Sequence, residues 1–239
     1  LNKTEELQRI IAGRDKLYSV IAHDLRSPMG SIKMVLNMLM LNLPVEKIGG
    51  EMYELLTMAN RTTEDVFSLL DNLLKWTKSQ IGNLNVVYQD VDAVEVVDSV
   101  IDVFNMVAGL KKITIREEKP EKLPVCTDID MLKTIIRNLL SNAIKFSNEN
   151  SEVLVKMEEQ GDTVVVSVKD SGCGIDEEGQ QKLLHTDTHF STFGTNNEEG
   201  SGLGLLLCQD FAVKSGGKLW FTSKKGEGST FYFSIPLKK

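Results

Sequence analysis

The chain has few of the features that mark several classes of protein. Its 239 residues include only three cysteines, Cys126, Cys173 and Cys208, with neither paired nor Cys-x-x-Cys spacing. This pattern excludes a disulfide scaffold, offers no cysteine metal site and fits a reducing compartment. No apolar run approaches the ~18 residues that cross a bilayer, and no signal peptide is visible. We therefore expect no membrane contact within this stretch.

Positive charge is also scarce. The 27 lysines and arginines are outnumbered by 34 acidic residues, the net charge is −7, and no basic cluster stands out. Nucleic acid is therefore not expected as a partner. Hydrophobic residues make up 41% of the chain, enough for one or two domains with a buried core. The first residue is Leu1 and not Met, so we expect a piece of a longer protein.

Residues 1–41 and 51–81 each follow the period of a helix with one buried apolar stripe. Pro44 and Gly49-Gly50 separate the two segments, and Gly82-Asn83 ends the second. Two antiparallel helices with single stripes cannot enclose a core by themselves. We expect two copies of this helical hairpin to form a four-helix bundle in a homodimer. The stripe of the first helix includes Leu7, Ile10, Leu17, Ile21, Leu25, Ile32, Val35 and Leu39.

His23 lies on the first helix, ~160° around the axis from its nearest neighbours in the stripe, so it points away from them. Ser27 follows one turn later, and Pro28 predicts a bend. An imidazole in water is largely neutral near pH 7 and keeps one ring nitrogen free as a nucleophile. Asp24 is placed to hold the proton of the other nitrogen. For an isolated His-Asp pair, a surface histidine beside a solvated acid is the better interpretation, so the decision depends on the downstream motifs.

After Gly82 the period changes and predicts an α+β domain, a sandwich with helices on one face of a mixed sheet. Strands are expected at residues 84–91, 113–117, 125–127, 153–158, 163–169, 218–223 and 230–235. Helices are expected at 92–111, at 130–146 (capped by Asp128 or Asp130) and at 203–215. The polar stretch 176–199 is typical of a long loop.

A first motif lies on the predicted helix 130–146. Asn138, Asn142 and Lys145 are spaced to share one face, among neighbours that are otherwise apolar. Amide oxygens are hard, neutral ligands that suit a Mg²⁺ already bound to triphosphate, and a lysine can neutralise phosphate charge. A helix with a few polar residues facing water is the weaker interpretation, because Leu139, Leu140, Ile144 and Phe146 occupy the other face.

Three further motifs follow. Asp170 ends a strand and precedes Gly172 and Gly174, so its carboxylate can accept a hydrogen bond from an amino group while the glycines let backbone approach a ligand. Residues 190–195, Phe-Ser-Thr-Phe-Gly-Thr, lie within the long loop and are typical of a lid. The last motif, Gly200, Ser201, Gly202, Leu203 and Gly204, opens a helix whose free N–H groups can hold phosphate. Taken alone, each of these motifs is weak evidence.

Taken together, the motifs resemble those of the sensor histidine kinases of two-component signalling. Residues 23–28, His-Asp-Leu-Arg-Ser-Pro, match the phosphoacceptor box; residues 138–146 the N box; 170–174 and 200–204 the two glycine boxes; and 190–195 the F box. The resemblance covers nearly the whole chain. It implies that residues 1–82 are a dimerisation and histidine-phosphotransfer domain and that residues 83–239 are a Bergerat-type ATP-binding domain, as in histidine kinases, chaperones and topoisomerases.

The resemblance also implies roles. ATP and Mg²⁺ would be bound, with Asp170 on the adenine and Asn142 and Asn138 on the metal, and Thr230 matches a hydroxyl often near the adenine. His23 would accept the phosphoryl group, assisted by Asp24. It would then pass the group to an aspartate of a response-regulator receiver domain.

Ser27 stands where Thr or Asn usually orients the water that hydrolyses the phosphorylated receiver, and it keeps a hydroxyl. The chain would be the cytoplasmic portion of a longer sensor, whose parent can be membrane-anchored. His185 and His189 are taken as ordinary residues of the loop.

Two other classes of function stay open. One is an ATP-hydrolysing machine of the same nucleotide fold, such as a chaperone or topoisomerase domain. Those proteins carry a glutamate general base where this chain has Asn138, and the box around His23 has no place in them. The other is a dimeric scaffold with a degenerate nucleotide pocket. ATP-dependent phosphorylation of the chain itself separates all three.

Overall fold

A computed structural model describes residues 3–43, 49–80, 86–183, 195 and 203–237. The chain divides into two compact units, Leu1–Asn85 and Val86–Lys239, and each is described by itself. The domain boundary predicted between residues 82 and 83 falls on residues 81–85, outside the described ones. None of the described helices is long and apolar enough to cross a membrane.

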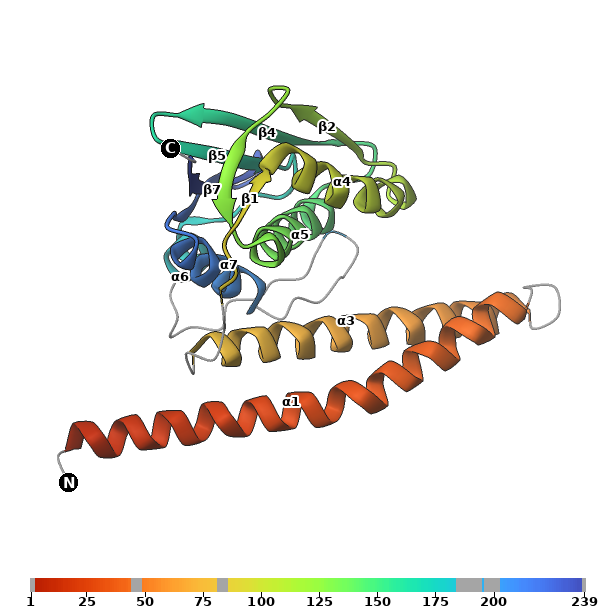
Figure 1. Cartoon of the computed structure of the whole chain (residues 1–239). Helices are drawn as coiled ribbons and strands as arrows, with labels where there is room; N and C mark the ends of the chain where they lie inside the picture. The colour runs from red at the N-terminus through yellow and green to blue at the C-terminus, as the bar shows by residue number, and fades with distance from the viewer. Residues whose placement is uncertain (1–2, 44–48, 81–85, 184–194, 196–202, 238–239) are drawn as a thin grey trace. The chain divides into compact units, whose positions relative to one another are not determined.

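The first unit is a pair of helices, α1 (Lys3–Asn42) and α3 (Gly50–Gln80), as the periodicity predicted. Gly49 immediately before α3 has a φ of +78°, a left-handed conformation that glycine adopts without strain. The first helix continues through Pro28, and its ribbon is bent and not straight (Figure 1).

Contact between the two helices is centred on a small residue. Ala22 is fully buried against Leu70 and Leu74, with Met29 and Leu73 packed beside them. The predicted stripe does not make this contact: five of its members are 37–52% exposed, namely Ile21, Leu25, Ile32, Val35 and Leu39. These members of the stripe are therefore left exposed in the single hairpin, and their expected burial between two copies stays a prediction. An alanine lets α3 approach α1 closely, and the larger residues then flank the contact line.

Charged side chains add a second set of contacts across the hairpin. Arg26 pairs with Asp71 at 2.8 Å, and its guanidinium lies 5.7 Å from the centre of the Phe67 ring. Lys33 lies 5.5 Å from the same ring and pairs with Glu64 at 3.5 Å. These pairs are partly exposed, so each contributes little stability, but together they keep Phe67 between two cations.

The second unit contains a five-stranded sheet in the order β2 (Thr114–Glu118), β4 (Glu152–Gln160), β5 (Thr163–Lys169), β7 (Gly228–Pro236), β6 (Leu219–Lys224). Only β2 and β4 are parallel, which gives the predicted mixed sheet. A separate antiparallel pair is formed by β1 (Gln89–Asp92) and β3 (Pro124–Thr127). The first strand is shorter than the predicted 84–91. A short helix, α6 (Glu177–Leu183), stands where a loop was predicted.

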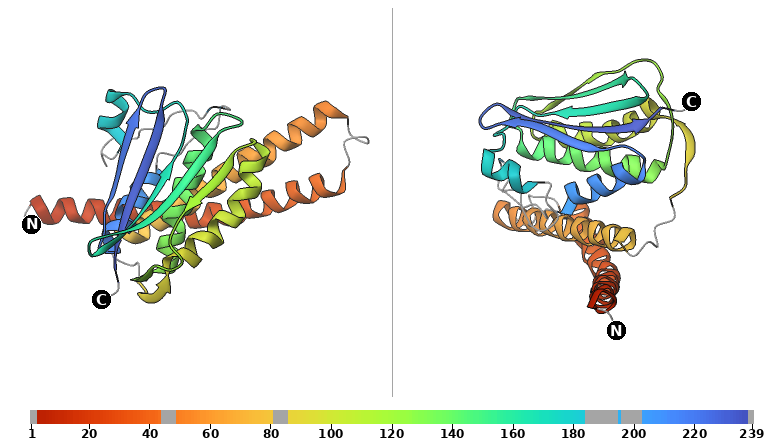
Figure 2. Two further views of the ribbon diagram at one scale, coloured as in Figure 1. Left: turned by 90° about the horizontal axis from the view of Figure 1, so that it is seen from above. Right: turned by 90° about the vertical axis from the view of Figure 1, so that its left-hand side faces the viewer.

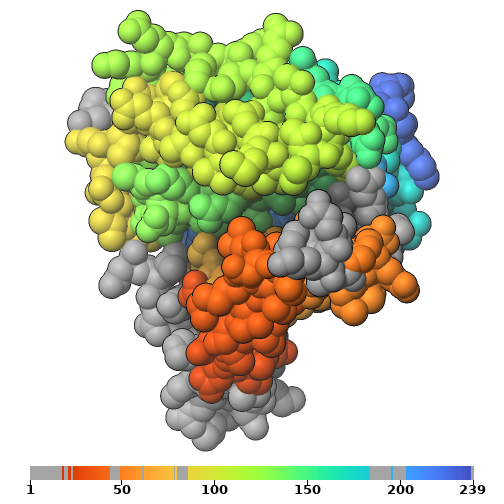
Figure 3. Space-filling model, turned by 90° about the vertical axis from the view of Figure 1, so that its right-hand side faces the viewer, coloured from red at the N-terminus to blue at the C-terminus, as the bar shows by residue number. Residues whose placement is uncertain are grey.

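Three helices, α4 (Ala93–Leu110), α5 (Ile129–Phe146) and α7 (Leu203–Lys214), lie along one face of the five-stranded sheet (Figure 2). The core lies between these two layers, where Leu139 and Leu140 of α5 and Phe233 of β7 are almost fully buried. The outer side of α4 is at the surface of this unit (Figure 3).

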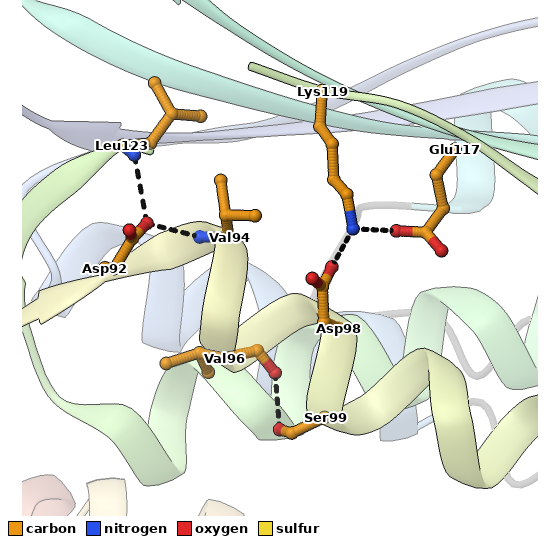
Figure 4. A network of polar contacts seen from close by, with 8 residues as sticks. All are labelled: Asp92, Val94, Val96, Asp98, Ser99, Glu117, Lys119 and Leu123. Atoms are coloured by element: carbon orange, nitrogen blue, oxygen red, sulfur yellow. Dashed lines mark hydrogen bonds and ion pairs between the residues drawn. The ribbon is translucent and has the colours of Figure 1, made fainter. Parts of the chain in front are cut away.

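Aspartates cap the first turns of α4 and α5. Asp92 caps α4, and its Oδ1 accepts from the backbone N–H groups of Val94 (3.0 Å) and Leu123 (2.9 Å), as Figure 4 shows. Of the two candidates for α5, the cap is Asp128. Its second oxygen also accepts from the N–H of Val87 at 2.8 Å, which ties the entry to this unit to the start of α5.

Candidate functional site

The polar residues predicted to bind the phosphate and metal lie on α5. Asn138, Asn142 and Lys145 are each half-buried, whereas the apolar side chains between them are buried: Leu139, Leu140, Ala143 and Ile144. This contrast comes from the helical period, which turns positions i, i+4 and i+7 away from the core together. The three residues therefore present two amides and one ammonium along one face of α5.

Asn138 also joins α5 to the start of α7. Its Nδ2 donates to the carbonyl of Thr134 at 2.9 Å, one turn back along α5. Its Oδ1 faces Gly204, where an added Cβ would lie only 2.6 Å from that oxygen. With Asn138 in this position, the glycine leaves room for its side chain against the first turn of α7, where the N box and the end of the second glycine box lie side by side.

Asp170 follows β5 and is 4% exposed. Its Oδ1 accepts from the backbone N–H of Gly172 at 2.9 Å and of Ser229 at 3.1 Å. Among the residues that the structure describes, none bonds its other oxygen, Oδ2. Burial raises the pKa of Asp170, and the two N–H groups partly offset that effect. The result is a fixed, buried acceptor suited to an amino group of a ligand.

The glycines around Asp170 allow protein backbone to pack against protein backbone. A Cβ on Gly172 would lie 2.0 Å from the carbonyl oxygen of Phe146, and one on Gly174 would lie 2.0 Å from that of Lys224. A Cβ on Gly228 of β7 would likewise lie 2.2 Å from the carbonyl oxygen of Asp170. The structure thus gives these glycines a packing role, and the approach of backbone to a ligand stays a prediction. They hold the Asp170 loop against the end of α5 and the β6–β7 turn.

Ser229, and not Thr230, is the hydroxyl residue next to Asp170. Ser229 donates its N–H to Asp170, and its Oγ lies 2.9 Å from the Oγ of Ser223. Side chains alternate along a strand, so Thr230 points to the opposite face of the sheet from Ser229. Of the two residues, it is therefore Ser229, and not the predicted Thr230, that contacts Asp170. The apolar residues Phe231, Phe233 and Ile235 alternate along this strand, so the sequence already indicated that Ser229 shares their buried face.

Comparison with known proteins supports an ATPase fold for the second unit. The family described as "Histidine kinase-, DNA gyrase B-, and HSP90-like ATPase" matches residues 127–239. The adaptive-response sensory kinase SasA of Crocosphaera subtropica is 29% identical over 238 residues, which is 98% of this chain and 62% of SasA. That alignment takes in α1 and α3, which distinguishes the chain from the gyrase and HSP90 branches. The chain belongs to the sensor histidine kinases.

Solved structures agree with this placement. The catalytic domain of the histidine kinase ThkA is 30% identical, with a TM-score of 0.55 over 63% of this chain and 96% of that domain. Full-length ShkA in complex with AMPPNP is 21% identical and has a TM-score of 0.70 over 94% of this chain and 46% of ShkA, which supports the fold alone. This histidine kinase chain spans about 60% of the length of the SasA relatives.

Several predicted residues of the kinase lie outside the described part of the chain. They are Gly200, Ser201, Gly202, His185, His189 and the side chain of His23, whose backbone lies in α1. Asp24 and Ser27 are exposed on the same helix, and the carbonyl of Ser27 accepts from Ser31 Oγ at 3.3 Å. Leu203 and Gly204 form the first turn of α7.

The donor set of the kinase fits a magnesium ion carried by a nucleotide. Within the described ranges, no group of three or more His, Cys, Asp or Glu side chains could hold a metal. Asn138 and Asn142 supply amide oxygens, which suit a Mg²⁺ that keeps phosphate and water as its other ligands. The residues present therefore fit ATP with its metal better than a resident metal centre.

Sequence reasoning missed one buried cation of the kinase. Lys111, the residue that ends α4, is 8% exposed and donates to backbone at the end of α5. Its neighbour Lys112 is exposed, and the sequence Lys-Lys gives no sign that the two differ. Both lysines follow Leu110, the last residue of α4, so the helical period does not separate them either.

Proposed function

We propose that this chain is the catalytic core of a sensor histidine kinase. The second unit binds ATP with Mg²⁺, His23 accepts the γ-phosphoryl group, and an aspartate of a receiver domain takes it from His23. The observation that carries the nucleotide assignment is the buried Asp170 carboxylate, with one oxygen held by two backbone N–H groups. Because the reaction consumes ATP, we place this core in the cytoplasm.

In this proposal, different residues of the second unit bind different parts of the nucleotide. Asp170 Oδ2 accepts from the 6-amino group of adenine, with Ser229 beside it. Asn142, with Asn138, holds the metal, and Lys145 meets phosphate charge. Bound Mg²⁺ neutralises part of the triphosphate charge. These groups act by positioning and by charge neutralisation, which supply most of the catalysis in phosphoryl transfer.

The transfer itself needs a nitrogen nucleophile. A neutral ring nitrogen of His23 forms a bond to the γ-phosphorus while the bond from that phosphorus to the bridging oxygen breaks, and ADP leaves. Asp24 accepts a hydrogen bond from the other ring N–H and stabilises the positive ring. A receiver carboxylate then forms a P–O bond as the N–P bond breaks, which restores His23.

Labelling with [γ-³²P]ATP tests this function. We expect the chain to acquire label that is lost in acid and retained in alkali, as a phosphoramidate requires. Release of inorganic phosphate without labelled protein would instead indicate an ATP-hydrolysing machine. Failure to bind or consume ATP would indicate a scaffold.

The exposed stripe of α1 predicts the dimer. Replacing Val35 by lysine puts a charge into an apolar face that we propose is buried between two copies, and we expect the dimer to dissociate at least tenfold more readily. Sedimentation at several concentrations measures this. Val103→Lys, at a comparably exposed valine of α4, is the matched control. A Val35→Lys chain that dimerises like wild type would contradict the bundle.

Receiver choice is expected to depend on the helical unit near His23. The predicted docking set is Ser31, Lys33, Asn37, Glu54, Met58 and Arg61. Lys33 is already engaged with Glu64 and Phe67, and the side chain of Arg61 lies outside the described residues. Exchanging all six for those of another kinase should shift the ratio of transfer rates between two competing receivers by about tenfold or more and leave autophosphorylation intact. A change in autophosphorylation without a change in receiver preference would exclude this surface.

A further inference from the structure

Lys111 is a buried ammonium group that joins three segments of the second unit. From the end of α4, its Nζ donates to the carbonyl oxygens of Ile144 at 3.0 Å and Lys145 at 2.9 Å, both in the last turn of α5. It also donates to Thr195 Oγ1 at 2.6 Å. An ammonium has three hydrogens, and each of these three acceptors can take one of them.

The position of this cation matches the charge of the helix end. The last carbonyls of a helix have no partner within it, and they carry the negative end of the helix dipole. Lys111 neutralises that end of α5 from another helix. An apolar residue in its place would remove this donor from the buried carbonyl of Ile144 and the part-buried carbonyl of Lys145, which is costly where water does not replace it.

Thr195 is attached to the same helix end by its own groups. Its N–H donates to Lys145 O at 3.2 Å, and its hydroxyl donates to Ser147 O at 2.8 Å. The hydroxyl therefore accepts from Lys111 and donates to α5. In the sequence, Thr195 ends the F box and stands five residues before Gly200. One cation thus fixes the F-box threonine and the final turn of the N-box helix together.

We propose that Lys111 is a positioning residue for nucleotide binding, and this inference rests on the proposed function. Lys145, whose carbonyl it holds, and Asn142, one turn earlier, belong to the polar face assigned to phosphate and metal. By fixing the last turn of α5 to Thr195, Lys111 sets where that face meets the triphosphate. Its charge never touches the substrate.

Binding of Mg·ATP to the whole chain tests this inference, measured by titration calorimetry with the folded fraction checked by thermal unfolding. We expect Lys111→Met to weaken Mg·ATP binding about tenfold, equivalent to about 1.4 kcal/mol. Lys112→Met, which removes the same charge from the adjacent exposed position, is the matched control and should bind like wild type. A Lys111→Met chain that melts earlier but binds Mg·ATP with wild-type affinity would overturn the inference, since Lys111 would then be only structural.

Thr195 supplies a second test that avoids loss of the buried charge. Thr195→Val removes the hydroxyl that Lys111 bonds and should weaken Mg·ATP binding severalfold, whereas Thr195→Ser keeps it and should restore affinity. In the double variant the losses should be less than additive, because both changes remove one shared contact. Equal affinities for Thr195→Val and Thr195→Ser would overturn the inference. A wild-type chain that does not bind Mg·ATP would instead remove the proposed function itself.

Discussion

Replacing His23 by alanine is expected to abolish stable phosphorylation of the chain and to leave Mg·ATP affinity within about twofold of wild type. The reason is that His23 belongs to α1, whereas every residue assigned to the nucleotide belongs to the second unit. Loss of the nucleophile removes the step that forms the N–P bond, and no other group on α1 replaces an imidazole nitrogen. Incorporation of acid-labile label from [γ-³²P]ATP, beside calorimetric titration of Mg·ATP, measures both halves.

The other two histidines provide the control for this result. A chain with both His185 and His189 replaced by alanine should keep its acid-labile label. Acid-labile phosphate that persists in His23→Ala would move the acceptor to one of these two residues. Loss of ATP binding in His23→Ala would contradict the separation of the phosphoacceptor from the nucleotide site.

Periodicity predicted the elements of this fold well. The strand 163–169 and the helix 203–215 agree with β5 and α7 to within one residue at each end. Local chemistry explains this agreement, because a valine-rich run after the turn at Gly161 defines β5 and a glycine pair ends α7. The polar face of α5 was likewise visible, since helical spacing alone groups Asn138, Asn142 and Lys145.

The sequence pattern did not predict the tertiary contacts. Whether Ala22 or the larger stripe meets α3 depends on how closely two helices approach, which periodicity does not specify. Gly172 packs against a carbonyl of α5 from a loop 26 residues further along the chain, and nothing near it in the sequence indicates that partner. Lys111 differs from Lys112 only because one of them faces the end of another helix.

Replacing Asp170 by asparagine is expected to weaken ATP binding about ten- to a hundredfold without unfolding the chain. Asparagine has the same shape, and its Oδ1 can still accept from Gly172 and Ser229. At the position of Oδ2, however, it presents an NH₂ group to the adenine amino group, so a charge-assisted bond in a buried site becomes a clash of two donors. Losing such a bond costs about 1.5–3 kcal/mol. Calorimetry measures the change, with Asp102→Asn, at an exposed carboxylate of α4, as the control.

The same variant should also change how stability depends on pH. Because burial raises the pKa of Asp170, the folded chain holds this proton more tightly than the unfolded chain. The stability that this group contributes is therefore fully present below the ordinary pKa of aspartate and is lost as pH rises through the raised value. Without nucleotide, Asp170→Asn should melt at a higher temperature than wild type at neutral pH, and this difference should close as the pH falls toward 4.

GTP, which presents a carbonyl where ATP presents an amino group, should bind the wild-type chain poorly. Equal affinity of the wild type for ATP and GTP would refute the assignment of Asp170 to adenine, even if the pH profile behaved as expected, since burial and the two backbone N–H groups set that profile without any nucleotide.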